Sequence, residues 1–232
     1  MTQLAFARTA VAAAALAFSF SASAASLVEG FDVVPVAGWT TVNNSAPTGT
    51  TGYFQGGPAV FNAFSGAPDS YVGVNFNSGS GGVAAISNWL ITPTLSFSNG
   101  DVVSFFTRTS TGSNYPDRLQ LRFSDVGGTN VGAMPTSVGT FTTLLLDINP
   151  TLNTGGFPED WTQFSVTISG LGGPTNGAVA FRYFVTNGGP SGDNSNYIGI
   201  DSFSITPVPE PTTWLLMGLG LGALALRRKQ AA

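Results

Sequence analysis

Carboxylates are the groups in this chain that could support catalysis, because its 232 residues contain no histidine and no cysteine. Mechanisms that depend on a histidine base or a cysteine thiol are therefore excluded. A glycosidase instead needs two carboxyl groups about 5 to 10 Å apart across a cleft. The candidates are Asp117 and the adjacent pair Glu159 and Asp160, but neighbours in an extended segment point to opposite faces. The sequence therefore predicts a protein that is not an enzyme, with a carbohydrate-active enzyme using a carboxylate pair as the alternative.

A loop rich in polar side chains spans residues 189–197. Its Asp193 and Asn196 could bind the hydroxyl groups of a sugar while a nearby aromatic ring stacks on the pyranose face. The tyrosines that could supply this ring are Tyr115, Tyr183 and Tyr197. The alternative is a solvated turn, because Asn, Gly and Ser form loops for conformational reasons alone.

The charge of the chain excludes one class of partner. Residues 25–207 contain four arginines, no lysine and eleven acidic residues, which gives a net charge of −7. Binding to nucleic acid requires clustered lysine or arginine. The sequence therefore predicts no nucleic-acid partner.

The N-terminal segment has the three parts of a secretory signal peptide. Arg8 supplies the positive charge, residues 11–20 form an apolar stretch, and Ala22 and Ala24 give the small-residue cleavage pattern. Cleavage is expected after Ala24, with Ala25 as the alternative. The missing arginine pair favours the general secretory route over the twin-arginine route.

The C-terminal segment, residues 208–232, contains a Pro-Glu-Pro hinge, an apolar run over residues 214–226 and a basic cluster, in that order. The hinge and the cluster consist of Pro209, Glu210, Pro211, Arg227, Arg228 and Lys229. This tripartite tail resembles the PEP-CTERM sorting signal, which exosortase-type membrane peptidases of Gram-negative bacteria recognise. The resemblance implies such a peptidase as partner and cleavage near the hinge.

The apolar run is short for a permanent membrane anchor. Its thirteen residues rise about 20 Å as a helix, whereas the hydrocarbon core of a bilayer is about 30 Å thick. We therefore expect transient insertion in the inner membrane, with the basic cluster on the cytoplasmic side and the preceding chain outside. Delivery to the cell surface or the extracellular space would follow. The alternative is an ordinary anchor that is never cut.

Short apolar runs predict β-strands throughout residues 25–207. Thirty glycines and fourteen prolines interrupt the whole chain, and most runs between them alternate apolar and polar residues. Strands are expected at 71–76, 89–95 (interrupted by Pro93), 102–109, 118–123, 141–148, 161–168, 178–186 and 197–205. The dipeptide Asn99-Gly100 predicts a tight hairpin before the third of these. Many short strands with turns between them predict an all-β, antiparallel, jelly-roll-like sandwich.

Three motifs in this region resemble the choice-of-anchor J family. They are Glu29-Gly30-Phe31-Asp32, the central segment 87–93 and the closing segment 198–203. That family has many PEP-CTERM members and is similar to cleaved-adhesin modules and, more remotely, to MAM domains. The resemblance implies a jelly-roll sandwich that is displayed outside cells. The cysteines of MAM domains are missing here.

The resemblance also implies a cation site, because related jelly rolls often hold a cation where the two ends of the sandwich meet on adjacent strands. Glu29, Asp32 and Asp201 would then supply carboxylate oxygens to a calcium ion, with Asp69 as a fourth candidate. The alternative is that Asp32 and Asp201 cap turns or accept backbone hydrogen bonds.

Together these features predict a signal peptide (1–24), a choice-of-anchor J-like sandwich (25–207) and a sorting signal (208–232). The expected role is a binding or structural module at the cell surface or in the extracellular matrix, associated with exopolysaccharide or biofilm. A carbohydrate-active enzyme and a permanently membrane-anchored surface adhesin are the alternatives.

Overall fold

The computed structural model describes residues 26–208 and 218–220 of the chain. The predicted signal peptide and nearly all of the predicted sorting tail lie outside the described residues. The predicted cleavage and sorting residues therefore also lie outside the described part, namely Ala22, Ala24, Pro209, Glu210, Pro211, Arg227, Arg228 and Lys229. In the part of the chain that is described, no helix is long and apolar enough to cross a membrane.

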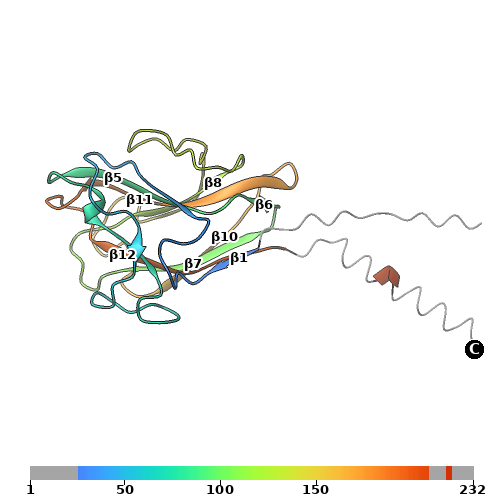
Figure 1. The fold of residues 1–232 in the computed structure, drawn as a ribbon, viewed down its shortest axis with the longest axis horizontal. Helices are drawn as coiled ribbons and strands as arrows, with labels where there is room; N and C mark the ends of the chain where they lie inside the picture. Colours follow the sequence, from blue (N-terminus) through green and yellow to red (C-terminus); the bar gives the residue numbers. More distant parts are fainter. Residues whose placement is uncertain (1–25, 209–217, 221–232) are drawn as a thin grey trace, which may run out of the picture.

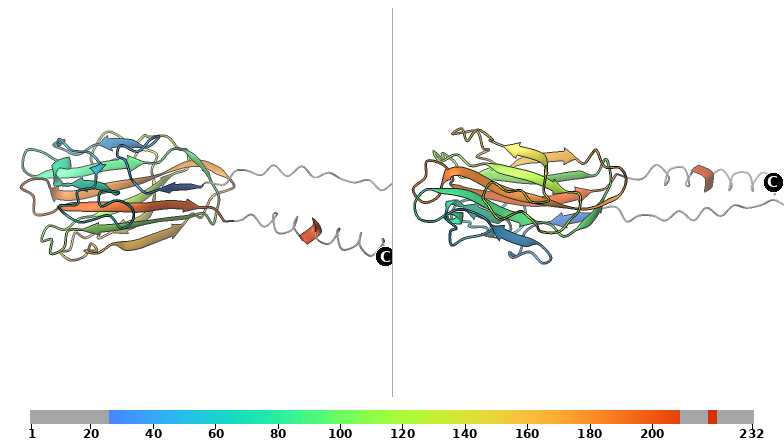
Figure 2. Two further views of the ribbon diagram at one scale, coloured as in Figure 1. Left: turned by 60° about the horizontal axis from the view of Figure 1, so that its bottom comes forward. Right: turned by 90° about the horizontal axis from the view of Figure 1, so that it is seen from above.

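Two antiparallel sheets lie face to face and form a β-sandwich (Figure 1 and Figure 2). In the first, here named sheet A, the strand order is β10-β7-β12-β4-β3, and β1 pairs with β12. Its strands are β1 (Leu27–Glu29), β3 (Phe54–Gln55), β4 (Val72–Asn75), β7 (Val102–Thr109), β10 (Thr162–Thr167) and β12 (Tyr197–Thr206).

The second sheet, sheet B, has the order β2-β5-β11-β8-β9, and β6 pairs with β11. Its strands are β2 (Thr40–Asn43), β5 (Ala84–Ile91), β6 (Leu95–Phe97), β8 (Leu119–Ser124), β9 (Thr143–Ile148) and β11 (Thr175–Gly188). One 3-10 turn, η1 (Phe76–Ser78), follows β4. The predicted all-β antiparallel sandwich is therefore confirmed.

Aromatic side chains from both sheets fill the space between them. Phe105 of β7 meets Phe181 of β11 edge to face at 4.8 Å between ring centroids, and Phe181 meets Phe203 of β12 at 5.5 Å. Trp39 packs against both Phe31 and Phe203. Each large side chain buried in this way contributes about 1.5–3 kcal/mol. Since the chain has no cysteine, this packing takes the place that disulfides hold in many exported domains.

Most of the predicted strands lie close to their predicted positions, although β5 begins five residues earlier than expected. β7 has the predicted bounds, and its residues are buried at every second position, as an alternating sequence requires. The strand expected over 89–95 is interrupted at Pro93 as predicted, because proline has no backbone N–H to donate to a ladder. β5 ends before Pro93 and β6 begins after it. β1, β2 and β3 were not predicted, since two to four residues are too few to show an alternation.

The predicted hairpin at Asn99-Gly100 is wrong. A turn does occur there, and Gly100 has the positive φ of +99° that the dipeptide suggests. However, β6 before the turn pairs with β11 in sheet B, whereas β7 after it pairs with β10 and β12 in sheet A. The turn carries the chain from one sheet to the other. Hydrogen bonds to distant partners hold it, with Gly100 donating to Ile168 and the Asn99 side chain to Leu171.

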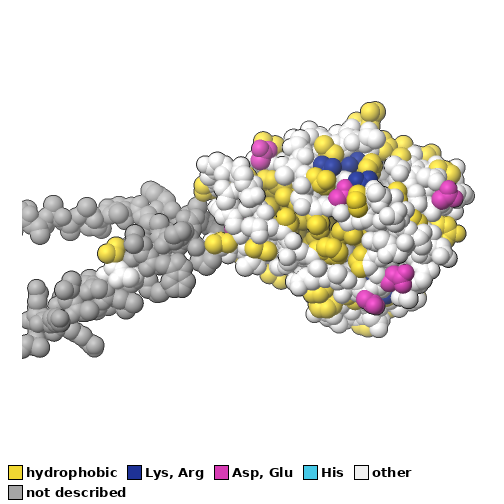
Figure 3. Space-filling view, turned by 180° about the vertical axis from the view of Figure 1, so that it is seen from behind, with side chains coloured by type: hydrophobic (Ala, Val, Ile, Leu, Met, Phe, Trp, Pro, Cys, Tyr) yellow, Lys and Arg dark blue, Asp and Glu magenta, His cyan; other side chains and the backbone are white. Residues whose placement is uncertain are grey.

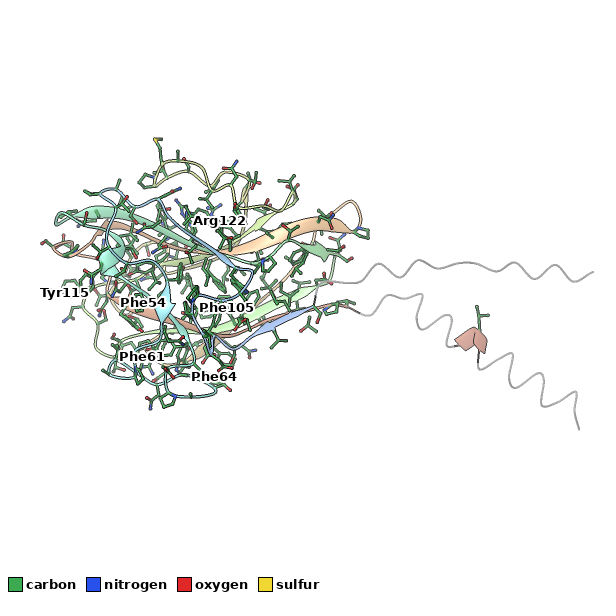
Figure 4. The ribbon with its side chains drawn as sticks, viewed as in Figure 1. Phe54, Phe61, Phe64, Phe105, Tyr115 and Arg122 are labelled. Atoms are coloured by element: carbon green, nitrogen blue, oxygen red, sulfur yellow. The ribbon has the colours of Figure 1, made fainter. Side chains whose placement is uncertain are left out.

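The first and last described strands place both ends of the sandwich at one side of the molecule. β1 pairs with the end of β12, with Leu27 opposite Ile205, so residues 26 and 208 leave the domain together (Figure 1). This confirms that the two ends lie on adjacent strands. Tyr115, in the loop between β7 and β8, lies at the opposite end of the sandwich (Figure 4).

Candidate ligand-binding site

A hollow of about 410 Å³ opens at the end of the sandwich that is far from residues 26 and 208. The β7–β8 loop, the first residue of η1 and the β11–β12 loop form its walls. The lining residues are Phe76, Tyr115, Gly189, Pro190, Ser191, Gly192, Asp193, Ser195 and Asn196. The hollow therefore offers an aromatic ring, a carboxylate, an amide and backbone groups at one opening.

Hydrogen bonds between loops hold the polar groups of the hollow in place. Asn196 donates from Nδ2 to Ser113 Oγ at 2.8 Å, and Asp193 Oδ2 accepts from Asn187 Nδ2 at 2.7 Å. Tyr115 is 53% exposed. An exposed ring beside fixed hydrogen-bonding groups can bind one sugar unit, since the ring covers the apolar face while the polar groups bind hydroxyls.

The carboxylate of Asp117 lies beside the hollow and fixes one of its loops. It is fully buried and accepts hydrogen bonds from Thr109 Oγ1 at 2.6 Å and from the Asn196 backbone N–H at 2.8 Å. The Tyr183 hydroxyl donates a third. Burial raises the pKa of Asp117, and the three hydrogen bonds oppose this rise. Through its bond to the backbone N–H of Asn196, Asp117 fixes the position of this residue at the edge of the hollow.

The structure brings together only part of the sugar site expected from the sequence. Asp193 and Asn196 line the hollow with Tyr115. Tyr197 does not, because it is only 7% exposed and packs in an aromatic cluster on the outer face of sheet A. Tyr183 is fully buried in the core.

Two of the predicted calcium ligands lie against one loop. Asp201 Oδ2 accepts the backbone N–H groups of Phe64 at 2.8 Å and Ser65 at 3.1 Å. An oxygen of Asp32 lies 3.3 Å from the position that a Cβ on Gly66 would take. Burial raises the pKa of Asp201, and the two amides and Ser202 oppose the rise.

The other two candidates have different partners. Glu29 Oε1 accepts the backbone N–H of Phe31 at 2.7 Å, and Gln55 Nε2 donates to the backbone carbonyl of Asp69 at 2.6 Å. Within residues 26–208 and 218–220, no three Asp, Glu, His or Cys side chains form a group that could hold a metal. The hydrogen bonds of Asp201 fit the alternative given above, in which this carboxylate accepts backbone N–H groups. Calcium binding stays a prediction.

The carboxylates considered for catalysis do not face a cleft together. Asp117 and Glu159 line a second cavity, but its volume is only about 10 Å³, roughly the space of one water molecule. Glu159 Oε2 accepts the backbone N–H of Gly112 at 3.0 Å. Asp160 is not among the residues that line this cavity.

Sequence reasoning missed a cluster of arginines. Arg118, Arg122 and Arg182 lie around Asp147 on the outer face of sheet B. The sequence contains one signal of it, since Arg118 and Arg122 fall on the same face of an alternating strand. Arg182 is sixty residues away along the chain, so its place depends on the pairing of β11 with β8.

Comparison with known proteins identifies the tail and the fold. Residues 207–229 match the PEP-CTERM protein-sorting motif. This motif marks a protein that exosortase-type machinery processes and that is sorted to the cell surface. The prediction of a sorting signal at this end of the chain is therefore confirmed.

In fold, the sandwich is similar to cleaved adhesin domains of Lys-gingipain from Porphyromonas gingivalis. The K1 domain has a TM-score of 0.57 and 23% identity over 80% of this chain and 99% of that domain. The K3 domain has a TM-score of 0.53 and 19% identity over 78% and 97%, respectively. No curated protein sequence matches the chain. The similarity to cleaved adhesins is confirmed at the level of the fold, and membership of the choice-of-anchor J family stays a prediction.

Proposed function

We propose that this chain is an exported, exosortase-processed surface protein whose sandwich is a non-catalytic binding module for polysaccharide. In this proposal residues 1–24 are a signal peptide, residues 25–207 form the module, and residues 208–232 are the sorting signal. The hollow lined by Tyr115, Asp193 and Asn196 binds a single sugar unit of the polymer. Association with exopolysaccharide in a biofilm is the setting that follows.

The observation that carries this proposal is the composition and position of the hollow. Its volume of about 410 Å³ falls within the range of small-ligand pockets, about 300–1,000 Å³. Its polar groups are fixed by hydrogen bonds to Ser113 and Asn187, so little conformational freedom is lost on binding. It lies at the end of the sandwich opposite to residue 208 (Figure 4). A chain attached through its C-terminal side would therefore present the hollow outward.

The charge of the hollow limits the sugars that fit it. Among residues 26–208 and 218–220, Asp193 is the only carboxylate that lines the hollow, and no arginine or lysine of these residues lines it. Because a carboxylate repels an anionic ligand, we propose a neutral or amino sugar at this site.

A non-catalytic role is also supported by the state of the carboxylates. Asp117 is buried and already accepts three hydrogen bonds, and the cavity that it shares with Glu159 is too small for a glycosidic bond. A general acid must reach the leaving oxygen directly or through one water. The permanently anchored adhesin remains as a second candidate, and it differs only in the fate of the tail.

Replacing Tyr115 by Ala should weaken polysaccharide binding about tenfold, because loss of a stacked ring costs about 1.4 kcal/mol. Asp193→Ala should weaken it to a similar degree. Affinity electrophoresis of the full-length chain through gels that contain neutral or amino-sugar polymers measures the effect. Phe64→Ala is the matched control, since Phe64 is an exposed aromatic residue, 47% accessible, on another loop.

Equal retardation of the Tyr115→Ala and wild-type proteins would show that the hollow is not the sugar site. New reducing ends released from these polymers by the wild-type protein, and lost in Glu159→Gln, would instead establish the carbohydrate-active enzyme.

A further inference from the structure

The outer face of sheet B carries most of the positive charge of the sandwich. Three of the four arginines in residues 26–208 lie there, namely Arg118, Arg122 and Arg182. Figure 3 shows basic side chains gathered at one place on the surface, among hydrophobic side chains and beside an acidic one. Figure 4 places Arg122 over sheet B, away from the end that carries Tyr115. We name these three residues the arginine face.

Among the residues that the structure describes, one carboxylate, that of Asp147, is bonded to the arginine face. Arg118 binds Asp147 with two parallel hydrogen bonds, at 2.8 Å from Nε and 2.6 Å from Nη2. The other two arginines bind neutral acceptors only. Arg122 donates to Gln120 and to the backbone carbonyl of Phe141, and Arg182 to Ser87, Gln120 and the backbone carbonyl of Pro135. The group therefore carries a local charge of +2 within a domain of net charge −7.

Without a bound anion, the three positive charges repel one another. Burial, followed by the charges of Arg122 and Arg118, lowers the pKa of Arg182 to about 9, and Asp147 only partly opposes this. Burial likewise lowers the pKa of Arg122. A second anion at this place would relieve the repulsion. Stacking of Arg182 on the rings of Trp89 and Phe184 stabilises one of these cations. It does not offset the repulsion among the three arginines.

The arginine face is partly open to solvent. The side chains of Arg118 and Asp147 are 17% and 14% exposed, and Arg122 is also partly exposed. Arg182 is buried below them, and its guanidinium lies 3.8 Å from the ring centroid of Phe184. An anion would contact Arg118 and Arg122 directly. The positive charge of the buried Arg182 would attract it from below.

We propose that the arginine face is a binding site for a carboxylate ligand, of the kind carried by uronic acid units. Asp147 shows the mode, since the planar guanidinium of Arg118 already holds a carboxylate by two bonds there. The site is separate from the hollow. It would bind anionic sugars, whereas the hollow is proposed to bind neutral or amino sugars. It does not depend on the function proposed for the hollow.

The test is titration of the full-length chain, in mild detergent, with polygalacturonate, with monomeric galacturonate and with neutral dextran. Wild-type protein should bind both carboxylate ligands and not dextran, and its affinity should fall as salt is added. A polymer that binds more tightly per sugar unit than the monomer indicates polysaccharide as the source. Equal affinity per unit indicates a small free carboxylate.

Three variants make the assignment specific. Arg122→Gln should reduce affinity about tenfold, since a charge-assisted hydrogen bond is lost. Asp147→Asn should increase affinity, because it removes the competing carboxylate, while the amide oxygen can still accept one of the two hydrogen bonds from Arg118. Arg108→Gln is the control, with the same change in net charge but on β7 in sheet A. Absence of galacturonate binding by the wild type, or an equal loss in Arg108→Gln, would overturn the proposal.

Discussion

Asp117→Ala should lower the free energy of unfolding by about 3–5 kcal/mol, because it leaves buried donors without acceptors, each at a cost of about 1–3 kcal/mol. The Tyr183 hydroxyl and the Asn196 backbone N–H would both lose their partner. Thr109 would keep a bond, since its hydroxyl also reaches the Tyr197 carbonyl at 3.0 Å. Urea unfolding of the two proteins measures the difference.

Asp117→Asn is the matched control for this effect. Its amide oxygen can still accept from Tyr183 and Asn196, and its NH₂ group can donate to Thr109 Oγ1, whose own hydrogen then goes to the Tyr197 carbonyl. We therefore expect this variant to lose less than about 1 kcal/mol. A loss as large as that of the Ala variant would mean that the negative charge, and not the hydrogen bonding, holds the loop.

Asp117 should also give folding stability a defined pH dependence. Because burial raises its pKa above the ordinary value of 3.8, the folded chain binds this proton more tightly than the unfolded chain. The stabilisation is therefore complete at low pH and is lost as the pH rises through the raised pKa. The stability of the wild type minus that of Asp117→Asn should increase as the pH falls from about 7 to about 4. A difference that decreases over this range would contradict a buried, ionisable Asp117.

Gly199→Ala should destabilise the fold by about 1–3 kcal/mol, as expected when a methyl group is forced into a filled site. A Cβ at Gly199 would lie 2.8 Å from Trp161 Cη2 and 2.9 Å from atoms of Phe61 and Tyr71. These rings cover β12 from outside, and Gly73 on β4 lies opposite Gly199 in the ladder. The pair of glycines provides the flat surface on which the rings lie.

The loop that carries Phe61 should therefore loosen in Gly199→Ala. Hydrogen exchange of residues 57–66 should become faster, together with a lower melting temperature. Gly52→Ala is the control, because a Cβ at Gly52 would meet nothing within 4 Å. Unchanged melting in Gly199→Ala would show that the aromatic cover does not depend on close contact with the strand.

The sequence predicted the sandwich well where the physical signal is local. The alternation over residues 102–109 depends only on neighbouring positions, and β7 has those bounds. The turn at Asn99-Gly100 also formed as a turn. The prediction of a hairpin was wrong about the partners of the two flanking strands. A dipeptide specifies backbone angles, but it does not specify which sheet each strand joins.

The candidate sites were harder to predict because they depend on contacts between distant residues. Tyr115 and Asp193 meet in the hollow only because the β7–β8 and β11–β12 loops lie at the same end of the sandwich. The sequence offered three tyrosines as partners for the polar loop and gave no means of choosing among them. Arg182 similarly joins Arg118 only through the register of β11 with β8.

The mass of the mature C-terminus tests sorting to the surface most directly. The protein should be isolated from a strain that produces an exosortase and from an otherwise identical strain that lacks it. With the enzyme, we expect a surface-exposed chain that ends near Pro209–Pro211 and has lost Arg227, Arg228 and Lys229. Without it, the tail should be retained. An uncut chain ending at Ala232 in the surface fraction of both strains would contradict exosortase processing and establish a permanent anchor instead.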